Sequence, residues 1–188
     1  MKIYLASRSS RRRELLEQLD IEFDIIDIKI DETWDGNESA KNYVQRLAIE
    51  KARAAKKHLG NSNHLPILAA DTEVVLDDII MGKPDDKEDA IKMLHSLSGR
   101  THSVFSAVAL IHKGENIKLN TNRVCFRPLT TNEIKTYCET GEPLGKAGAY
   151  AIQGKAAAFI ERLEGSYSGV MGLPLYETSE LLRTIKEI

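Results

Sequence analysis

Residues 65–84, LPILAADTEVVLDDIIMGKP, carry the side chains whose types and spacing best suit chemistry. An apolar run from Leu65 to Ala70 predicts a buried strand, and Asp71 follows at its end. A carboxylate in such a strand costs free energy unless a metal ion or a lysine balances its charge, and Lys83 follows between a glycine and a proline. Asp71 and Lys83 are therefore candidates for a charged active site. They would also fit a strand-end aspartate that caps a turn, followed by a surface lysine.

A second candidate lies near the N-terminus. A short apolar strand, Ile3 to Ala6, runs into SRSSRRR at positions 7–13 and then into a helical pattern over 14–19. A turn between strand and helix exposes backbone N–H groups that bind anions. Arginine opposes the positive end of the helix dipole, so four arginines here need a reason, and a polyphosphate supplies one. The alternative is a solvated basic turn or a nucleic-acid patch.

The rest of the chain supplies the elements that must position these groups. Strands and helices alternate, but a hairpin interrupts them, so we expect a mixed rather than a purely parallel sheet in an α/β fold. Patterning predicts further strands over 21–30, 74–76, 101–112, 117–127 and 156–163, and loops over 60–64, 141–154 and 165–174. It predicts helices from Ala40 to Ala55, after capping boxes at Asp85/Glu88 and Thr130/Glu133, and around 181–185.

The composition excludes several classes of protein. With 188 residues, 42% of them hydrophobic and 29% charged, the chain can bury one core, as one domain or as two lobes sharing a sheet. A formal charge of −2 gives no basic field for nucleic acid. Cys125 and Cys138 match no zinc, redox or disulfide spacing, so we expect reduced core residues. We find no signal-peptide pattern and no membrane-length apolar run, and we expect a cytoplasmic protein.

Six motifs, in order, resemble those of the Maf family of nucleoside triphosphate pyrophosphatases over about residues 3–182. Each motif alone is a weak match, whereas six in register make a strong one. They are LAS-x-S-x-RR at 5–12, ADT at 70–72, GKP at 82–84, LSGR-x-H at 97–102, GKAGAYAIQG at 145–154 and VMGLP at 170–174. The family usually has proline where this chain has Ser10; proline presets φ at a helix start, whereas serine offers a capping hydroxyl.

The resemblance implies an elongated mixed sheet flanked by helices, with two lobes around a central cleft, in a single domain over residues 1–188. It implies hydrolysis of a nucleoside triphosphate to the monophosphate and pyrophosphate with a divalent metal, Mg²⁺ or Mn²⁺. It also suggests a homodimer.

Roles for individual residues follow from the same resemblance. Arg12 and Ser9 would hold phosphate oxygens at the helix start, Lys83 would contact phosphate from the opposite wall, and Lys51 matches a family lysine. These cations would neutralise the charge of the triphosphate during attack by water.

Two acidic residues, Asp71 of the ADT motif and Glu32, resemble the acidic residues of the family's site. Asp71 would be the general base, which contributes roughly 10²–10⁴-fold in rate. Glu32 would bind the metal or orient the water, so Asp71 and Glu32 are the predicted metal ligands.

In the family that this chain resembles, three positions separate two subgroups of different base preference. Arg, Thr and Gln mark a subgroup acting on dTTP and UTP, and an aromatic residue, Gln and Glu mark one acting on 7-methyl-GTP; this chain has Arg11, Thr72 and Gln153. A glutamine amide can donate to a pyrimidine carbonyl and accept from N3–H. The sequence therefore predicts a dTTP/UTP pyrophosphatase that also accepts base-modified uridine nucleotides. Gln153 would alternatively be a loop amide bonded within the protein.

Three rival functions stay open at this point. One is the same hydrolysis with 7-methyl-GTP or a purine nucleotide as substrate. Another is a nucleotide sensor in cell division that binds triphosphate without turnover. The third, an RNA-binding module on Arg8–Arg13, is weakened by the missing aromatic platform and the slightly negative charge.

Overall fold

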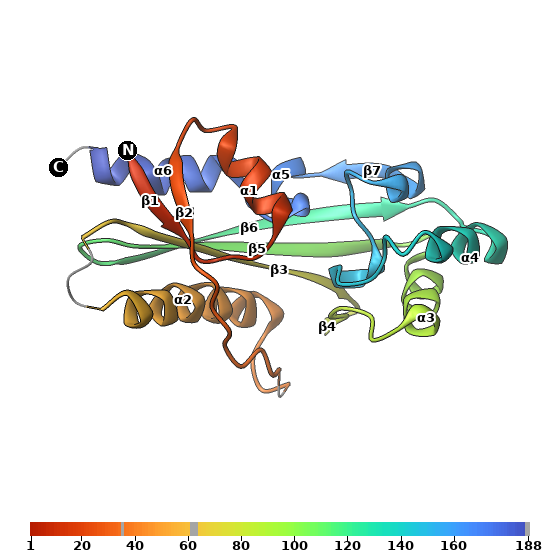
Figure 1. Ribbon diagram of the computed structural model, residues 1–188. Helices are drawn as coiled ribbons and strands as arrows, with labels where there is room; N and C mark the ends of the chain where they lie inside the picture. Colours follow the sequence, from red (N-terminus) through yellow and green to blue (C-terminus); the bar gives the residue numbers. More distant parts are fainter. Residues whose placement is uncertain (35, 61–63, 187–188) are drawn as a thin grey trace.

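The computed structural model describes residues 1–34, 36–60 and 64–186. Within them a mixed sheet runs through the molecule (Figure 1). The path of the sheet is β2 (Glu22–Ile25), β1 (Lys2–Leu5), β3 (Ile67–Leu76), β5 (Thr101–Ile111), β6 (Glu115–Phe126) and β7 (Ile160–Glu164), with β4 (Ile79–Ile80) beside β3. Strands β2, β1 and β3 are parallel and β3, β5, β6 and β7 are antiparallel, which confirms the predicted mixed α/β sheet.

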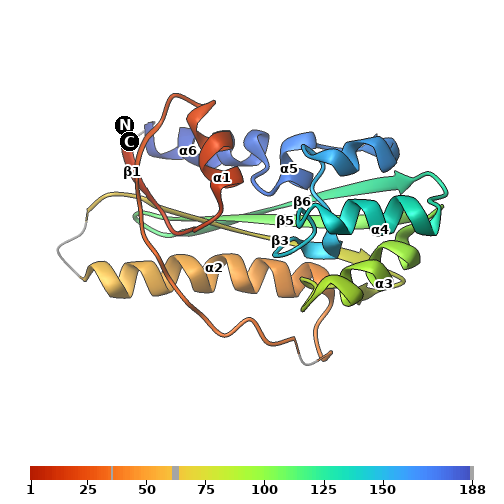
Figure 2. The same ribbon diagram turned by 45° about the vertical axis from the view of Figure 1, so that its right-hand side comes forward.

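Helices cover both faces of this sheet (Figures 1 and 2). The long α2 lies on one face, α1 and α6 lie on the other, and α3 and α4 lie at the far end of the long strands. The helices are α1 (Ser10–Glu17), α2 (Ala40–Leu59), α3 (Lys87–Leu97), α4 (Thr131–Glu139), α5 (Tyr167–Met171) and α6 (Leu175–Lys186), with 3₁₀ turns η1 (Ala147–Ala149) and η2 (Lys155–Phe159). None of the described helices is both long and apolar enough to cross a membrane.

Strand β3 distributes its side chains between the two faces with a period of two. Ile67 and Ala69 pack in the cluster under α2, whereas Leu68 and Ala70 pack in the cluster under α1 and α6. The small side chains on the α2 side let the helix approach the sheet closely. The same alternation assigns residues 71 and 73 to the α2 face and residues 72 and 74 to the opposite face.

The middle of β3 has an open edge on one side. Strand β1 pairs with β3 only at Ile67 and Leu68, and β4 pairs with it only at Val75 and Leu76. Between these contacts, β3 has β5 as its strand neighbour on one side, within the described residues, and none on the other. Ligands of open α/β sheets bind where parallel strands end. Strand β1 ends at this gap, and a turn over residues 6–9 leads from it into α1.

Several predicted elements are confirmed. The helix from Ala40, the hairpin of β5 and β6, the turn near 113–116 and the final helix are all present. Thr130 and Glu133 form the predicted reciprocal capping box of α4. Cys138 is buried as expected, while Cys125 is only partly buried. Most of the predicted loop at 60–64 lies outside the described residues, and the single-domain organisation stays a prediction.

Other predictions about the strands were wrong. We expected the first apolar run to end before Asp71, but β3 continues unbroken to Leu76, because β5 pairs with it from Ile67 to Val75, including at Asp71. The predicted strand over 21–30 is only Glu22–Ile25, since β1 offers it four paired residues. Residues 155–159 form a 3₁₀ turn, so the last strand begins at Ile160.

Two helix starts also differ from the prediction. Asp86, not Asp85, is the N-cap of α3, and its side chain accepts from the backbone N–H of Asp89. The glycine-containing segment 165–174, expected to be a loop, contains α5, which Ser166 caps by accepting from the N–H of Gly169.

Candidate active site

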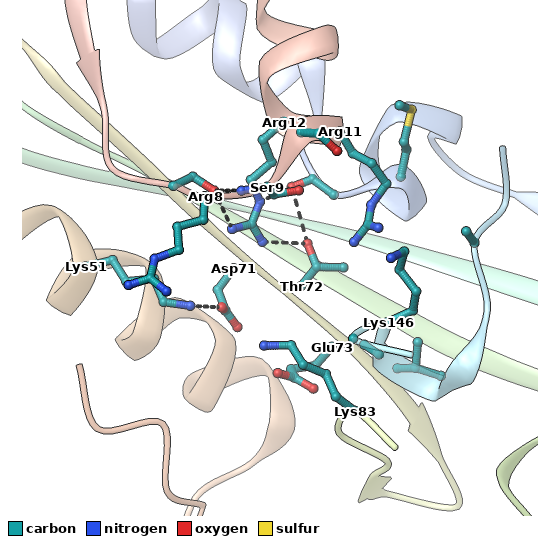
Figure 3. A pocket seen from close by; sticks show the side chains of 18 of the residues that line it. Arg8, Ser9, Arg11, Arg12, Lys51, Asp71, Thr72, Glu73, Lys83 and Lys146 are labelled. Atoms are coloured by element: carbon teal, nitrogen blue, oxygen red, sulfur yellow. Dashed lines mark hydrogen bonds and ion pairs between the residues drawn. The ribbon is translucent and has the colours of Figure 1, made fainter. Parts of the chain in front are cut away.

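A cavity of about 680 Å³ lies at the open edge of β3, between the start of α1, helix α2 and the loop over 145–154 (Figure 3). Among the described residues, seven cationic side chains and three carboxylates line it. The cations are Arg8, Arg11, Arg12, Lys29, Lys51, Lys83 and Lys146, and the carboxylates are Glu32, Asp71 and Glu73. An excess of positive charge around a hollow of this size suits a polyanion.

The start of α1 forms one wall of the cavity. Ser9 is the N-cap and its side chain makes no capping hydrogen bond, so the first N–H groups of the helix have no side-chain cap there. Ser10 occupies the first helical position, where proline is favoured, and not the N-cap. The expected capping hydroxyl from Ser10 is therefore not used.

Arg12 is fixed by three contacts from other segments. Its Nε donates to the carbonyl of Gly172 at 2.8 Å, and its Nη atoms lie 3.4 Å from Ser7 Oγ and 3.5 Å from Thr72 Oγ1. Burial lowers the pKa of Arg12, yet an arginine stays charged in proteins. The guanidinium is held in one orientation at the cavity wall.

Thr72 continues this chain of hydrogen bonds into the sheet. Its hydroxyl lies 2.8 Å from Ser106 Oγ, which donates to the carbonyl of Gly169 at 2.6 Å. Arg12, Thr72 and Ser106 therefore connect α1, β3, β5 and α5, and the position of Thr72 is fixed from both sides.

On the α2 face, Lys51 joins two carboxylates, and Figure 3 shows its contact with Asp71. Its Nζ lies 2.6 Å from Asp71 Oδ1 and 2.6 Å from Glu32 Oε1, and Lys83 Nζ lies 3.6 Å from Glu32 Oε2. Burial opposes the charge of Glu32, but hydrogen bonds and charge from Lys51 and Lys83 hold its pKa below the ordinary value. Asp71 is 5% exposed, and its Oδ2 is buried without a partner among the described residues.

Glu73 lines the same cavity, and sequence reasoning missed it. Its Oε2 is also buried without a partner within the described part of the chain. Burial, followed by the charge of Asp71, raises the pKa of Glu73 to about 8. Its position two residues after Asp71 could have indicated this, because residues two apart on a strand share a face. That inference requires β3 to continue beyond Asp71.

The loop over 145–154 closes the opposite wall. Gly148 has φ +64°, and a Cβ there would lie 2.8 Å from a Val74 side-chain carbon. Its N–H donates to the carbonyl of Gly82 at 2.8 Å, which holds the turn bearing Lys83. The same loop carries Lys146, a second residue that sequence reasoning missed. Burial lowers the pKa of Lys146, and the charge of Arg11 lowers it further.

Other motif residues are structural. His102 is 2% exposed, lies 2.8 Å from Tyr150 Oη through Nε2 and packs edge-on against Phe126. Burial lowers the pKa of His102 to about 4. Arg100 makes an ion pair at 2.7 Å with Asp77 in the turn between β3 and β4.

All nine residues predicted for the site lie on the wall of this one cavity. They are Ser9, Arg11, Arg12, Glu32, Lys51, Asp71, Thr72, Lys83 and Gln153. Of the N-terminal arginines, Arg8 lines it and also pairs with Asp27, while Arg13 is exposed outside it. Their individual roles stay predictions.

This chain is similar to a known protein family over most of its length. Residues 2–185 match the family model described as Maf-like protein. The chain belongs to the Maf family. Both the cavity and the six motifs therefore lie within the matched region, and the motif residues that line the cavity come from five of those six motifs.

Curated relatives match almost the whole length of this Maf chain. A protein of Alkalilimnicola ehrlichii named dTTP/UTP pyrophosphatase is 50% identical over 183 residues, covering 96% of this chain and 91% of that protein. A nucleoside triphosphate pyrophosphatase of Xylella fastidiosa strain M23 is 49% identical, covering 98% and 99%. A dTTP/UTP pyrophosphatase of Bordetella pertussis is 48% identical, covering 97% and 92%.

Solved structures give a more distant likeness. A nucleoside-triphosphatase (dITP/XTP pyrophosphatase) of Mycobacterium abscessus is 22% identical, with a TM-score of 0.47 over 67% of this chain and 74% of that one. The Ham1 protein of Staphylococcus aureus is 16% identical, with a TM-score of 0.48 over 67% and 72%.

Proposed function

We propose that this member of the Maf family hydrolyses dTTP and UTP to the monophosphate and pyrophosphate. The observation that carries the proposal is Asp71, a buried carboxylate with one unpartnered oxygen in a cavity lined mainly by cations. Relatives about half identical over nearly their full length are named dTTP/UTP pyrophosphatase, which supports the same reaction.

The cations would bind the triphosphate from two sides. Arg12, Ser9 and the N–H groups at the start of α1 would hold phosphate oxygens on one wall. Lys83 would bind phosphate from the other, and Lys51, 2.6 Å from Asp71 Oδ1, would hold that carboxylate in place. The charges that develop during attack would then be neutralised from several directions.

The reaction needs one proton acceptor. Water would attack the α-phosphorus, its proton would pass to Asp71, and the α–β phosphoanhydride bond would break with pyrophosphate as the leaving group. Glu32, which shares Lys51 with Asp71, would help to orient the water. An isolated water is a poor nucleophile, so loss of this base should be costly.

A divalent metal fits the donor set in one respect. Asp71 Oδ2 is a buried oxygen donor without a partner among the described residues, as a hard cation requires. The described residues hold no group of three or more His, Cys, Asp or Glu that could bind an ion alone. The family resemblance gives the ion, Mg²⁺ or Mn²⁺, to Asp71 and Glu32 together with phosphate oxygens. When bound, the ion would neutralise phosphate charge.

Base choice would rest on Arg11, Thr72 and Gln153. All three line the cavity, and Gln153 is exposed there. Its amide can both donate to and accept from the edge of uracil or thymine, and modified uridines that keep this edge would also be accepted.

A panel of nucleoside triphosphates, scored for pyrophosphate release with and without Mg²⁺, tests the proposal. UTP and dTTP should be hydrolysed faster than 7-methyl-GTP and the purine nucleotides. Release from 7-methyl-GTP but not from UTP or dTTP would contradict the substrate assignment.

The variant Asp71→Asn separates an enzyme from a nucleotide sensor. We expect turnover to fall by roughly 10²–10⁴-fold while UTP binding is largely kept. A wild-type protein that binds UTP without any turnover would favour the sensor instead.

A further inference from the structure

Two carboxylates of β3 face the cavity, and each has a buried oxygen without a hydrogen-bond partner among the described residues. Asp71 and Glu73 are two positions apart on one continuous strand, so they project from the same face of the sheet (Figure 3). Asp71 is 5% exposed. Its Oδ2 and the Oε2 of Glu73 are both buried without a hydrogen-bond partner in the described ranges. Buried unpaired oxygens of this kind call for a missing water or ion.

The nearby lysines do not meet this need. Lys51 contacts the other oxygen of Asp71 and one oxygen of Glu32, and Lys83 lies 3.6 Å from the remaining oxygen of Glu32. Within the described residues, no ion pair joins Glu73 to any cation. Glu32 is thus already paired through both oxygens, whereas Asp71 and Glu73 each keep one oxygen free.

We propose that Glu73 binds the divalent metal ion together with Asp71, in the place that the family resemblance gave to Glu32. The inference rests on the proposed function, because the ion is the one that accompanies the triphosphate. Mg²⁺ is usually held by one or two carboxylates with phosphate oxygens and water completing its coordination. A two-carboxylate site agrees with the lack of a three-residue cluster among the described residues.

The two roles of Asp71 are compatible. A carboxylate has about four lone-pair sites, so contact with an ion leaves Asp71 able to accept a proton from water. A divalent ion held by Asp71 and Glu73 would also favour the ionised form of the Glu73 carboxylate, which burial and the charge of Asp71 otherwise oppose. Glu32 would then serve to position Lys51 and Lys83.

Binding of Mn²⁺ without nucleotide tests the inference. We would measure the free Mn²⁺ signal by electron paramagnetic resonance for the wild type, Glu73→Gln, Glu32→Gln and Glu161→Gln, an exposed control on β7 outside the cavity. We expect Glu73→Gln to raise the Kd at least about tenfold, and the other two variants to stay within about twofold to threefold. A Kd for Glu73→Gln within twofold of wild type would overturn the inference.

A second measurement needs no variant. In wild-type crystals grown with Mn²⁺, the anomalous signal should lie on the carboxylates of Asp71 and Glu73. A peak on Glu32 away from Glu73, or no peak in the cavity, would overturn the inference. Turnover of UTP by the wild type reports on the proposed function separately, so the two can fail independently.

Discussion

At the scale of single residues, Lys51 links two carboxylates of the cavity. Its side chain is 14% exposed and joins Asp71, whose side chain is 6% exposed, to Glu32. The Coulomb energy of such a bridge exceeds that of a surface pair because water is largely excluded. Removing the lysine leaves a buried carboxylate without its cation.

We therefore predict that Lys51→Met lowers the free energy of unfolding by about 3 kcal/mol. The loss should shrink when Asp71→Asn is added, since the amide needs no counterion. Urea denaturation of both single variants and the double variant measures this coupling, with Lys57→Met, exposed on the same helix, as the control. Strict additivity would contradict the bridge.

Gln153 gives a prediction for specificity. In Gln153→Glu the carboxylate can no longer donate to a pyrimidine carbonyl and repels the triphosphate, so kcat/KM for UTP should fall about tenfold to hundredfold. Steady-state kinetics with UTP and 7-methyl-GTP measure it. Gln18→Glu, exposed after α1, is the control. An unchanged ratio between the two substrates would exclude Gln153 from base recognition.

His102 predicts how stability depends on pH. Its pKa of about 4 in the folded protein lies below the ordinary 6.5, so protonation favours unfolding. The contribution of neutral His102 to the free energy of unfolding is complete above about pH 6.5 and is lost as the pH falls towards 4. Between pH 7 and pH 5 it should weaken by about 2 kcal/mol. Urea denaturation at both pH values should show a smaller loss for His102→Gln, and an equal loss would refute the assignment.

At the scale of elements, the loop over 145–154 positions the turn of Lys83. Gly148 permits this, because φ +64° and the close approach of Val74 both exclude a side chain. The hydrogen bond from the N–H of Gly148 to the carbonyl of Gly82 holds the GKP turn against this loop. Loop, turn and strand therefore form one unit.

Gly148→Ala should lower the free energy of unfolding by about 2–4 kcal/mol, from the positive φ and the contact with Val74. It should also raise the KM for UTP, since Lys83 shifts with its turn. Thermal unfolding and kinetics measure both effects. Gly114→Ala is the matched control, because a Cβ there meets nothing within 4 Å and the φ is ordinary. Equal effects of both substitutions would contradict the role of the loop.

Sequence patterns predicted the elements that have strong local signals. Residues close in sequence determine three of them: the helix α2 with its long apolar stripe, the β5–β6 hairpin and the Thr130 capping box. The unbroken course of β3 was not predicted, because partnering by β5 overrides the polar residues in its middle. Glu73 was missed for this reason.

At the scale of the whole molecule, the cavity exists because distant segments meet at the open edge of β3. The start of α1, helix α2, the GKP turn and the loop over 145–154 each bring a charged group. Motif resemblance predicted which residues would gather there. It could not give the hydrogen bond from Arg12 to Gly172 or the sharing of Lys51 by two carboxylates, which depend on tertiary packing.

The central claim is that water, activated at Asp71, attacks the α-phosphorus of a triphosphate bound between these walls. Hydrolysis of UTP in H₂¹⁸O, followed by mass spectrometry of the products, tests it most directly. The account predicts ¹⁸O in the monophosphate and none in the released pyrophosphate. Label in pyrophosphate, or release of labelled orthophosphate, would contradict it.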